Sequence, residues 1–343
     1  MSHSIPITLL TGYLGSGKTT LLRALLAHTQ LRNTAVLVNE FGEIALDHQL
    51  LYASSETVVL LDRGCLCCAL RTDLAEQLDD LYTRRIRKEV PAFDRVVIET
   101  TGLADPGPIL QTLVAEPMLA ALYRLESVVT TVDAELGLRT LDEHFESVKQ
   151  AAVADCLVVT KVDRVDAAEL LKLEARLRDL NPAAPLVRSV NGEVDPGDIL
   201  GAEATCAEAK SHQVSRWLRS TSYQSLAPGT SLVSAASNRH DARIRSFALI
   251  YDAPVSGAKL WQGLEGLIEA HGEKLLRIKG IVNVDGASEP KVIHIVQHIL
   301  YPVQTLDQWP DADRRTRLVF IVQDLDPGVV RATIDSALGH RAD

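Results

Sequence analysis

The stretch Gly12–Thr19, GYLGSGKT, constrains the fold of this chain more than any other part of its sequence. It fits the phosphate-binding pattern G-x-x-x-x-G-K-[ST], and it lies between an apolar run at residues 5–10 and the helical stretch TTLLRALLAH. Glycines let backbone amides close around phosphate oxygens at the start of a helix, where the helix dipole favours negative charge. The segment therefore predicts a phosphate loop (P-loop) for a nucleoside triphosphate.

The residues around this loop have expected roles in phosphate chemistry. Lys18 is expected to reach the terminal phosphates, and the hydroxyl of Thr19 is expected to ligate magnesium. A P-loop also needs an acid at the end of another strand, and Glu99 at the end of RVVIE supplies it. The backbone amide of Gly102, in the following segment TTG, is placed to sense the γ-phosphate. Lys18, Thr19 and Glu99 are therefore the predicted catalytic residues.

The segment TKVD at residues 160–163 indicates which base is bound. It follows the apolar run CLVVT and matches the [NT]KxD pattern of GTPases. The carboxylate of Asp163 can accept two hydrogen bonds from guanine, whereas adenine offers only one suitable donor and leaves an acceptor unpaired. Lys161 and Asp163 are therefore predicted to bind GTP. Residues 188–191, RSVN, are a candidate for the last loop that contacts the base.

Three of the five cysteines crowd into the segment DRGCLCCAL, as Cys65, Cys67 and Cys68. Thiols in a reducing compartment are rarely paired as disulfides, and three thiolates suit zinc or copper(I). A closed structural zinc site would take a fourth Cys or His nearby, and none follows in sequence. An open fourth position is therefore expected, filled by water, Glu43, Glu40 or His48. The alternative is a redox-sensitive or merely packed cluster.

The alternation of β-branched runs with helical stretches predicts an α/β fold, a P-loop NTPase with a mostly parallel sheet covered by helices. This domain is expected to occupy residues 1–205. Residues 206–241 are expected to be a linker with a short helix near residues 214–219. From residue 242 the pattern changes to strands at RIRSFALIY, LLRIKGIVNV, KVIHIVQHIL and RLVFIVQDL, with a helix at LWQGLEGLIEAHG and a closing helix after Pro327. Residues 242–343 are therefore expected to form a small α+β domain.

Charge and hydropathy exclude two classes of partner. The formal net charge of −10 argues against a nucleic-acid or membrane-surface protein, because phosphate binding needs a basic face. The basic run RRIRK at residues 84–88 is expected to cap an exposed helix end. The start MSHSIPITLL lacks the features of a signal peptide, and no apolar stretch reaches the ~20 residues of a membrane span. The chain is therefore expected to be cytoplasmic.

Five motifs in order, GYLGSGKTT, NEFGEIALD, GCLCCAL, ETTGLADP and TKVD, resemble those of the CobW family of P-loop GTPases, whose class includes the nickel-enzyme accessory GTPases. The segments HGEKLLRIKGIV, VQHILYP and WPDADRRTRLVFI resemble the CobW C-terminal domain. The resemblance covers nearly the whole chain. It implies a GTP-hydrolysing metallochaperone, with zinc as the most frequent cargo and cobalt in other branches.

The resemblance also carries roles over to positions of this chain. It implies that Cys65, Cys67 and Cys68 are the metal ligands, that Thr19 and Glu99 serve magnesium, and that Asp47 lies in a switch segment. The nucleotide-binding residues that it implies are Gly12, Tyr13, Leu14, Gly15, Ser16, Gly17, Lys18, Thr19, Thr20, Lys161 and Asp163. Many zinc-handling members carry a His-rich loop, but the ten histidines here are scattered. His294 and His298 lie in one predicted strand, and a core or surface role is favoured over metal ligation for both.

These features predict a two-state switch in which GTP and Mg²⁺ order the segments that flank the CxCC loop. Hydrolysis would release them and let an unidentified client protein take Zn²⁺. Slow hydrolysis is expected because the sequence offers no arginine finger.

One alternative function with the same site is a cobalt-delivering GTPase that serves cobalamin synthesis or nitrile hydratase. Another alternative is a GTP-binding metal sensor or buffer, which would transfer no metal to a client. A P-loop small-molecule kinase would leave TKVD unexplained. Related GTPases often dimerise, so a homodimer is a further hypothesis.

Overall fold

The computed structural model describes residues 4–38, 59–61, 70–199 and 243–340. The chain divides into two compact units, Met1–Glu174 with Leu186–Gly201, and Ala175–Pro185 with Ala202–Asp343. The expected boundaries put Ala175–Pro185 in the first domain, but its contacts group it with the second unit. There the hydroxyl of Ser246 donates to the carbonyl oxygen of Asp179 at 2.7 Å, and Ala183 packs in a cluster with Ala248 and Val319.

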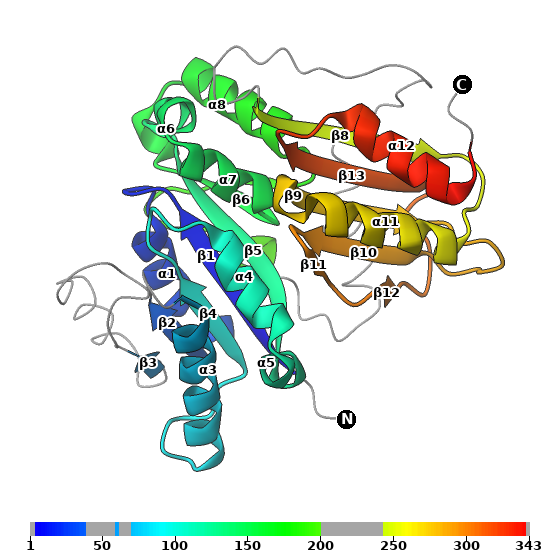
Figure 1. Cartoon of the computed structure of the whole chain (residues 1–343). Coiled ribbons are helices and arrows are strands. Elements are labelled where there is room, and N and C mark those ends of the chain that lie inside the picture. The colour runs from blue at the N-terminus through cyan, green and yellow to red at the C-terminus, as the bar shows by residue number, and fades with distance from the viewer. Residues whose placement is uncertain (1–3, 39–58, 62–69, 200–242, 341–343) are drawn as a thin grey trace. The chain divides into compact units, whose positions relative to one another are not determined.

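A parallel sheet forms the centre of the first unit, as the alternating pattern predicts (Figure 1). The strand order is β3-β2-β4-β1-β5-β6-β7, and every pairing is parallel. The strands are β1 (Ile5–Gly12), β2 (Thr34–Val38), β3 (Val59–Leu61), β4 (Arg95–Glu99), β5 (Tyr123–Asp133), β6 (Cys156–Thr160) and β7 (Leu186–Arg188). Strand β7 was not expected, and β5 begins four residues before the run that predicted it, 127–132.

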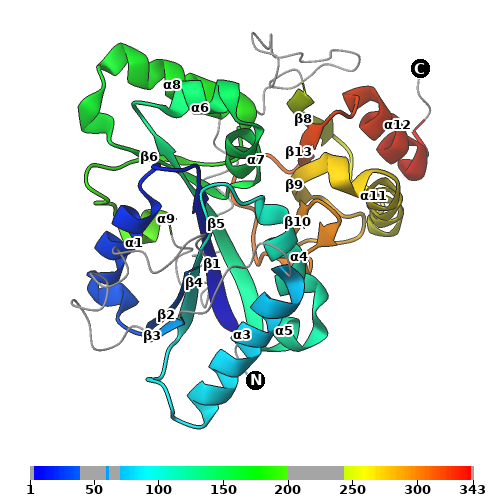
Figure 2. The same cartoon turned by 60° about the vertical axis from the view of Figure 1, so that its left-hand side comes forward.

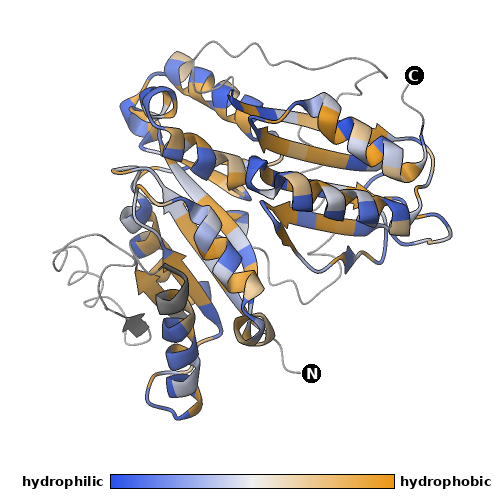
Figure 3. Cartoon of the chain, in the orientation of Figure 1, coloured by the Kyte–Doolittle hydropathy of each residue, from blue (hydrophilic) through white to orange (hydrophobic). Residues whose placement is uncertain are grey.

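Helices cover both faces of this sheet (Figure 2). They are α1 (Lys18–Leu26), α3 (Leu70–Ile86), α4 (Pro106–Ala115), α5 (Pro117–Leu122), α6 (Gly137–Glu143), α7 (Phe145–Val153), α8 (Ala167–Leu180) and α9 (Pro196–Ile199). Helices α1 and α9 lie on one face, and α3, α4, α5 and α7 lie on the other. Leu21, Leu22 and Leu25 form an apolar stripe on α1 and pack on Val97 and Val129. Burial on both faces explains why the strands are almost continuously hydrophobic (Figure 3).

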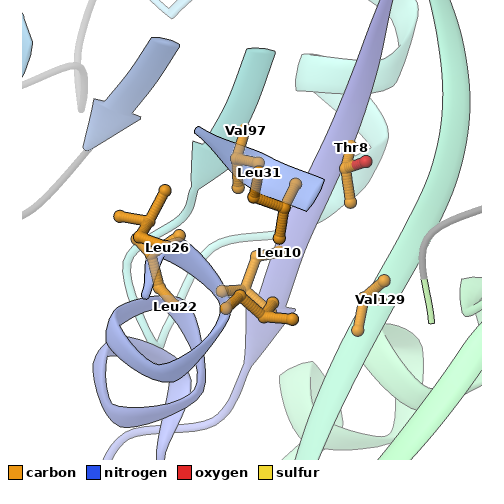
Figure 4. Close-up of a pocket in the computed structure, with 8 residues that line it drawn as sticks. Thr8, Leu10, Leu22, Leu26, Leu31, Val97 and Val129 are labelled. Atoms are coloured by element: carbon orange, nitrogen blue, oxygen red, sulfur yellow. The ribbon is translucent and has the colours of Figure 1, made fainter. Parts of the chain in front are cut away.

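A small void lies between α1 and the sheet (Figure 4). Its lining consists of Thr8, Leu10, Leu22, Leu25, Leu26, Leu31, Val97 and Val129. The hydroxyl of Thr8 is the only polar side-chain group in this set, and it is buried without a hydrogen-bond partner. The apolar lining indicates a gap in the core and no ligand site.

The second unit contains an antiparallel sheet under two helices, which confirms the expected α+β domain. Its order is β11-β10-β9-β13-β8, with β12 paired to β10. The strands are β8 (Ile244–Tyr251), β9 (Leu275–Val282), β10 (Lys291–Val296), β11 (Ile299–Leu300), β12 (Gln304–Thr305) and β13 (Thr316–Gln323). Helices α11 (Gly257–His271) and α12 (Pro327–Leu338) share one core cluster with this sheet. Among the described helices, none is long and apolar enough to cross a bilayer.

The segment KVIHIVQHIL is not the single strand that its apolar pattern predicts. Strand β10 ends at Val296 and β11 begins at Ile299, and these two residues pair across a tight turn. The turn forms at Gln297, whose φ is 53°, a conformation that the sequence does not mark with glycine. His298 therefore lies in the turn and does not share a strand with His294, so that prediction was wrong.

Candidate functional site

The phosphate loop begins where β1 ends and closes onto the first turn of α1. Gly12 is required there because a Cβ would lie 2.5 Å from the carbonyl oxygen of Thr131 on β5. Gly17 caps α1 with a φ of 90°, which favours glycine. The hydroxyls of Ser16 and Thr131 lie 2.7 Å apart. Backbone amides at such a helix start form an anion-binding concavity. The contact between Ser16 and Thr131 anchors this loop to β5.

Lys18 is buried, and its ammonium group lies across this loop. Nζ donates to the carbonyl oxygen of Gly12 at 2.9 Å and to that of Tyr13 at 3.2 Å. These bonds hold a positive charge at the loop itself, within the first turn of the helix. The side chain therefore lies beside the position where the loop amides would bind a phosphate.

Thr19 and Glu99 meet because helix α1, which carries Thr19, follows strand β1, and β1 pairs with β4, which ends at Glu99. Strand β4 pairs with β1 so that Leu10 lies opposite Glu99, and the hydroxyl of Thr19 donates to Oε1 of Glu99 at 2.8 Å. The carboxylate of Glu99 is buried. A hydroxyl and a carboxylate are the hard oxygen donors that magnesium prefers, so these two residues fit a Mg²⁺ ion beside bound phosphate.

The segment after β4 lies directly against the phosphate loop. The amide of Thr100 donates to the carbonyl oxygen of Leu10 at 2.9 Å. The hydroxyl of Thr100 donates to the hydroxyl oxygen of Thr11 at 2.8 Å. A Cβ at Gly102 would lie 2.6 Å from the amide nitrogen of Leu14. Only a glycine backbone can approach the loop so closely, so residue 102 lies directly against the phosphate loop.

The TKVD segment is tied to the phosphate loop at its first residue. The hydroxyl of Thr160 donates to the carbonyl oxygen of Ser16 at 2.8 Å. Lys161 adopts a φ of 55° and its Nζ donates to Oδ2 of Asp133 at 2.5 Å. Asp163 is exposed in the short 3₁₀ turn Val162–Arg164. The carboxylate of Asp163 is therefore available to a ligand, while the other two side chains fix the segment in place.

The candidate loop at residues 188–191 divides into two parts. Nε of Arg188 donates to Oε1 of Glu174 on α8 at 2.6 Å, so this side chain is used inside the unit. Ser189 is buried, and its hydroxyl has no hydrogen-bond partner. A Cβ at Gly192 would lie 2.6 Å from the carbonyl oxygen of Thr20, so this turn lies beside the first turn of α1. Contact of residues 188–191 with the base stays a prediction.

The predicted metal ligands Cys65, Cys67, Cys68 and Glu43 lie outside the described residues, as do Glu40, Asp47, His48 and the linker helix near residues 214–219. Strands β2 and β3 nevertheless end at Val38 and Leu61, on the same edge of the sheet as Glu99. Within the described ranges, no group of three or more His, Cys, Asp or Glu side chains is arranged to hold a metal ion.

Sequence reasoning missed several residues around the nucleotide site. Asp133 ends β5, and its Oδ1 also accepts from the amides of Glu135 and Leu136 at 2.8 and 3.2 Å. An acid at a strand end is the signal that identified Glu99, so the same signal could have identified Asp133. Gln150 and His144, described below, carry no such signal because they lie in or beside a helix with ordinary amphipathic spacing.

Comparisons with known proteins cover both units. Residues 6–188 match the CobW/HypB/UreG nucleotide-binding domain, and residues 244–338 match the cobalamin synthesis protein CobW C-terminal domain. The zinc chaperone YjiA of Escherichia coli is 33% identical over 330 residues, which are 96% of this chain and 98% of that protein. The zinc chaperone CobW of Pseudomonas aeruginosa is 30% identical over 97% of this chain and 92% of its own. The crystal structure of Zn(II)-bound YjiA GTPase from E. coli matches with a TM-score of 0.71 and 27% identity, over 99% of this chain and 100% of that one.

Proposed function

The chain belongs to the CobW/HypB/UreG family of P-loop GTPases, and from this premise we propose that it is a metallochaperone that binds zinc and transfers it to a client protein. The observation that carries this proposal is the shared edge of the parallel sheet. Glu99, beside Thr19, ends β4, and its neighbour β2 and the next strand β3 end at the same edge. Strand β3 ends at this edge, where nucleotide would bind, and Cys65 follows its last residue by four positions in the sequence.

Each described residue of the site has its own proposed role in GTP binding. The ammonium group of Lys18 contacts the terminal phosphates, and the backbone amides of the phosphate loop bind the remaining phosphate oxygens. Thr19 and Glu99 would hold Mg²⁺, which neutralises charge on the β- and γ-phosphate oxygens when it is bound. Thr160 and Asp133 fix the TKVD backbone, so that Asp163 can accept the two guanine donors. We propose slow intrinsic turnover, since the sequence offers no identifiable arginine finger.

Zinc is the proposed cargo, held by the thiolates of Cys65, Cys67 and Cys68. Three thiolates leave one coordination position open, which suits a metal that must be handed over. The fourth ligand is proposed to be water, Glu43, Glu40 or His48. The two full-length relatives are named zinc chaperones, which favours zinc over cobalt as the cargo of this chain. Competition between Zn²⁺ and Co²⁺ for the protein separates these two cargoes.

Nucleotide state is proposed to change zinc affinity through the backbone at the sheet edge. The segments after β2 and β4 would respond to the γ-phosphate, as Gly102 lies against the phosphate loop. The second unit is proposed to select the client. A reducing cytoplasm is the proposed location, because it keeps the three thiols available to metal. A homodimer stays a hypothesis.

Asp163→Asn is expected to lower GTP affinity about 100-fold, because the guanine donors lose a charged acceptor and meet an amide donor. Affinity for xanthosine triphosphate is expected to rise, since xanthine presents an oxygen where guanine has its amino group. Competition against a fluorescent nucleotide measures both constants. Asp166→Asn is the matched control, because Asp166 accepts from the amide of Glu169 and asparagine caps a helix equally well. Unchanged GTP affinity in Asp163→Asn would remove the assignment of guanine to TKVD.

A further inference from the structure

Helix α7 holds the segment that follows β4 through a fully buried glutamine. Nε2 of Gln150 donates to the carbonyl oxygen of Gly102 at 3.2 Å and to that of Ala104 at 3.0 Å. Because both partners are carbonyl oxygens, they fix which end of the amide is nitrogen. The backbone of Gln150 is held in turn, since its carbonyl oxygen accepts from the hydroxyl of Thr130 on β5 at 2.8 Å.

The neighbouring residue on α7 adds a second anchor to the same segment. Nζ of Lys149 donates to Oδ2 of Asp105 at 3.0 Å, and the other oxygen of Asp105 caps α4 by accepting from the amide of Gly107 at 2.9 Å. The segment from Gly102 to Asp105 is therefore bound by consecutive side chains of one helix, at the backbone of Gly102 and at the side chain of Asp105. Such a short segment has little freedom to shift unless these bonds change.

The same helix also touches the phosphate loop. The ring of His144, directly before α7, stacks on the ring of Tyr13 with centroids 4.6 Å apart and planes inclined by 17°. Gly102, which Gln150 holds, is the residue whose Cβ would meet the backbone of Leu14. The phosphate loop, the segment 102–105 and the start of α7 are thus linked in one closed set of contacts.

We infer that Gln150 is a positioning residue for GTP recognition: its amide holds the backbone of Gly102 and Ala104 against the phosphate loop, so that residue 102 meets the γ-phosphate. This inference rests on the proposed role of Gly102 in sensing that phosphate. Gln150 is fully buried, so its amide nitrogen has no contact with solvent and depends on these two carbonyl oxygens as acceptors. GDP lacks the γ-phosphate, so its affinity is independent of Gln150.

The test uses Gln150→Met in the full chain, since methionine keeps the length of the side chain and removes both donors. Affinities for GDP and for a non-hydrolysable GTP analogue, each with Mg²⁺, are measured together with kcat and KM for GTP. We expect affinity for the analogue to fall about tenfold, because the variant lacks the two hydrogen bonds that hold residue 102 at the γ-phosphate. We expect affinity for GDP to change less than about twofold, because GDP has no γ-phosphate. We also expect kcat to fall. Glu146→Gln, exposed on the same helix, is the matched control and is expected to change neither constant.

Each result decides between a positioning and a structural role. Equal loss of both nucleotides, or no change in either, would overturn the inference. If the methionine variant does not fold, Gln150→Asn, which keeps a neutral amide but is one methylene shorter and so withdraws the donors from both carbonyl oxygens, carries the same expectation. If the unmodified protein binds GDP and the analogue equally, the proposed γ-phosphate sensing fails and this inference fails with it. If the variant keeps the unmodified protein's ratio of affinities for the GTP analogue and GDP, the role of Gln150 is refuted and the proposed function is not affected.

Discussion

Replacement of Cys67 and Cys68 by serine in one chain is expected to abolish tight zinc binding and to leave GTP affinity unchanged. A serine hydroxyl stays protonated at neutral pH and cannot replace a thiolate ligand, so the affinity for Zn²⁺ is expected to fall by at least about 1,000-fold. The measurement is a competitive titration of the reduced protein with a zinc chelator, with GTP affinity measured on the same sample.

Cys156→Ala is the matched control for this experiment. Cys156 begins β6, is buried in the core of the first unit and lies outside the CxCC motif. Its loss is expected to leave zinc affinity unchanged. If the double serine variant retains the zinc affinity of the unmodified protein, the assignment of the metal to Cys65, Cys67 and Cys68 is refuted.

Lys18→Ala is expected to reduce GTP turnover by about 100-fold to 1,000-fold, in line with the loss of one preorganised group that stabilises transition-state charge. The alanine removes an ammonium group that the carbonyl oxygens of Gly12 and Tyr13 hold at the loop, and nothing in the loop replaces that charge. Phosphate release under saturating GTP and Mg²⁺ measures the effect. Lys172→Ala, exposed on α8, is the control for loss of a positive charge. Turnover within about threefold of the unmodified protein would contradict the role of Lys18.

The parts of the site that follow local rules were predictable from sequence. A P-loop has a fixed spacing, and the acid that it needs ends a neighbouring strand, so Lys18, Thr19 and Glu99 could be named before the structure. The structure brings the hydroxyl of Thr19 within 2.8 Å of Glu99. The resemblance to CobW GTPases, drawn from motifs in order, is confirmed by family models that match both parts of the chain.

The parts that depend on contacts between distant segments were not predictable. Gln150 lies 48 residues from Gly102, and nothing in the pattern of α7 distinguishes it from a core-facing polar residue. The turn at Gln297 lacks glycine, so an alternating apolar run concealed a hairpin. The segment Ala175–Pro185 joins the second unit through a hydroxyl and a small apolar cluster, which no local periodicity marks.

Coupling between the nucleotide state and zinc affinity is measured by titrating the reduced protein with zinc in three states. These are the protein without nucleotide, with GDP, and with a non-hydrolysable GTP analogue plus Mg²⁺. We expect zinc affinity to differ by about tenfold or more between nucleotide states, which corresponds to a coupling free energy of about 1.4 kcal/mol or more. Tight zinc binding of equal affinity in all three states would rule out this coupling and favour a sensor or a structural zinc site.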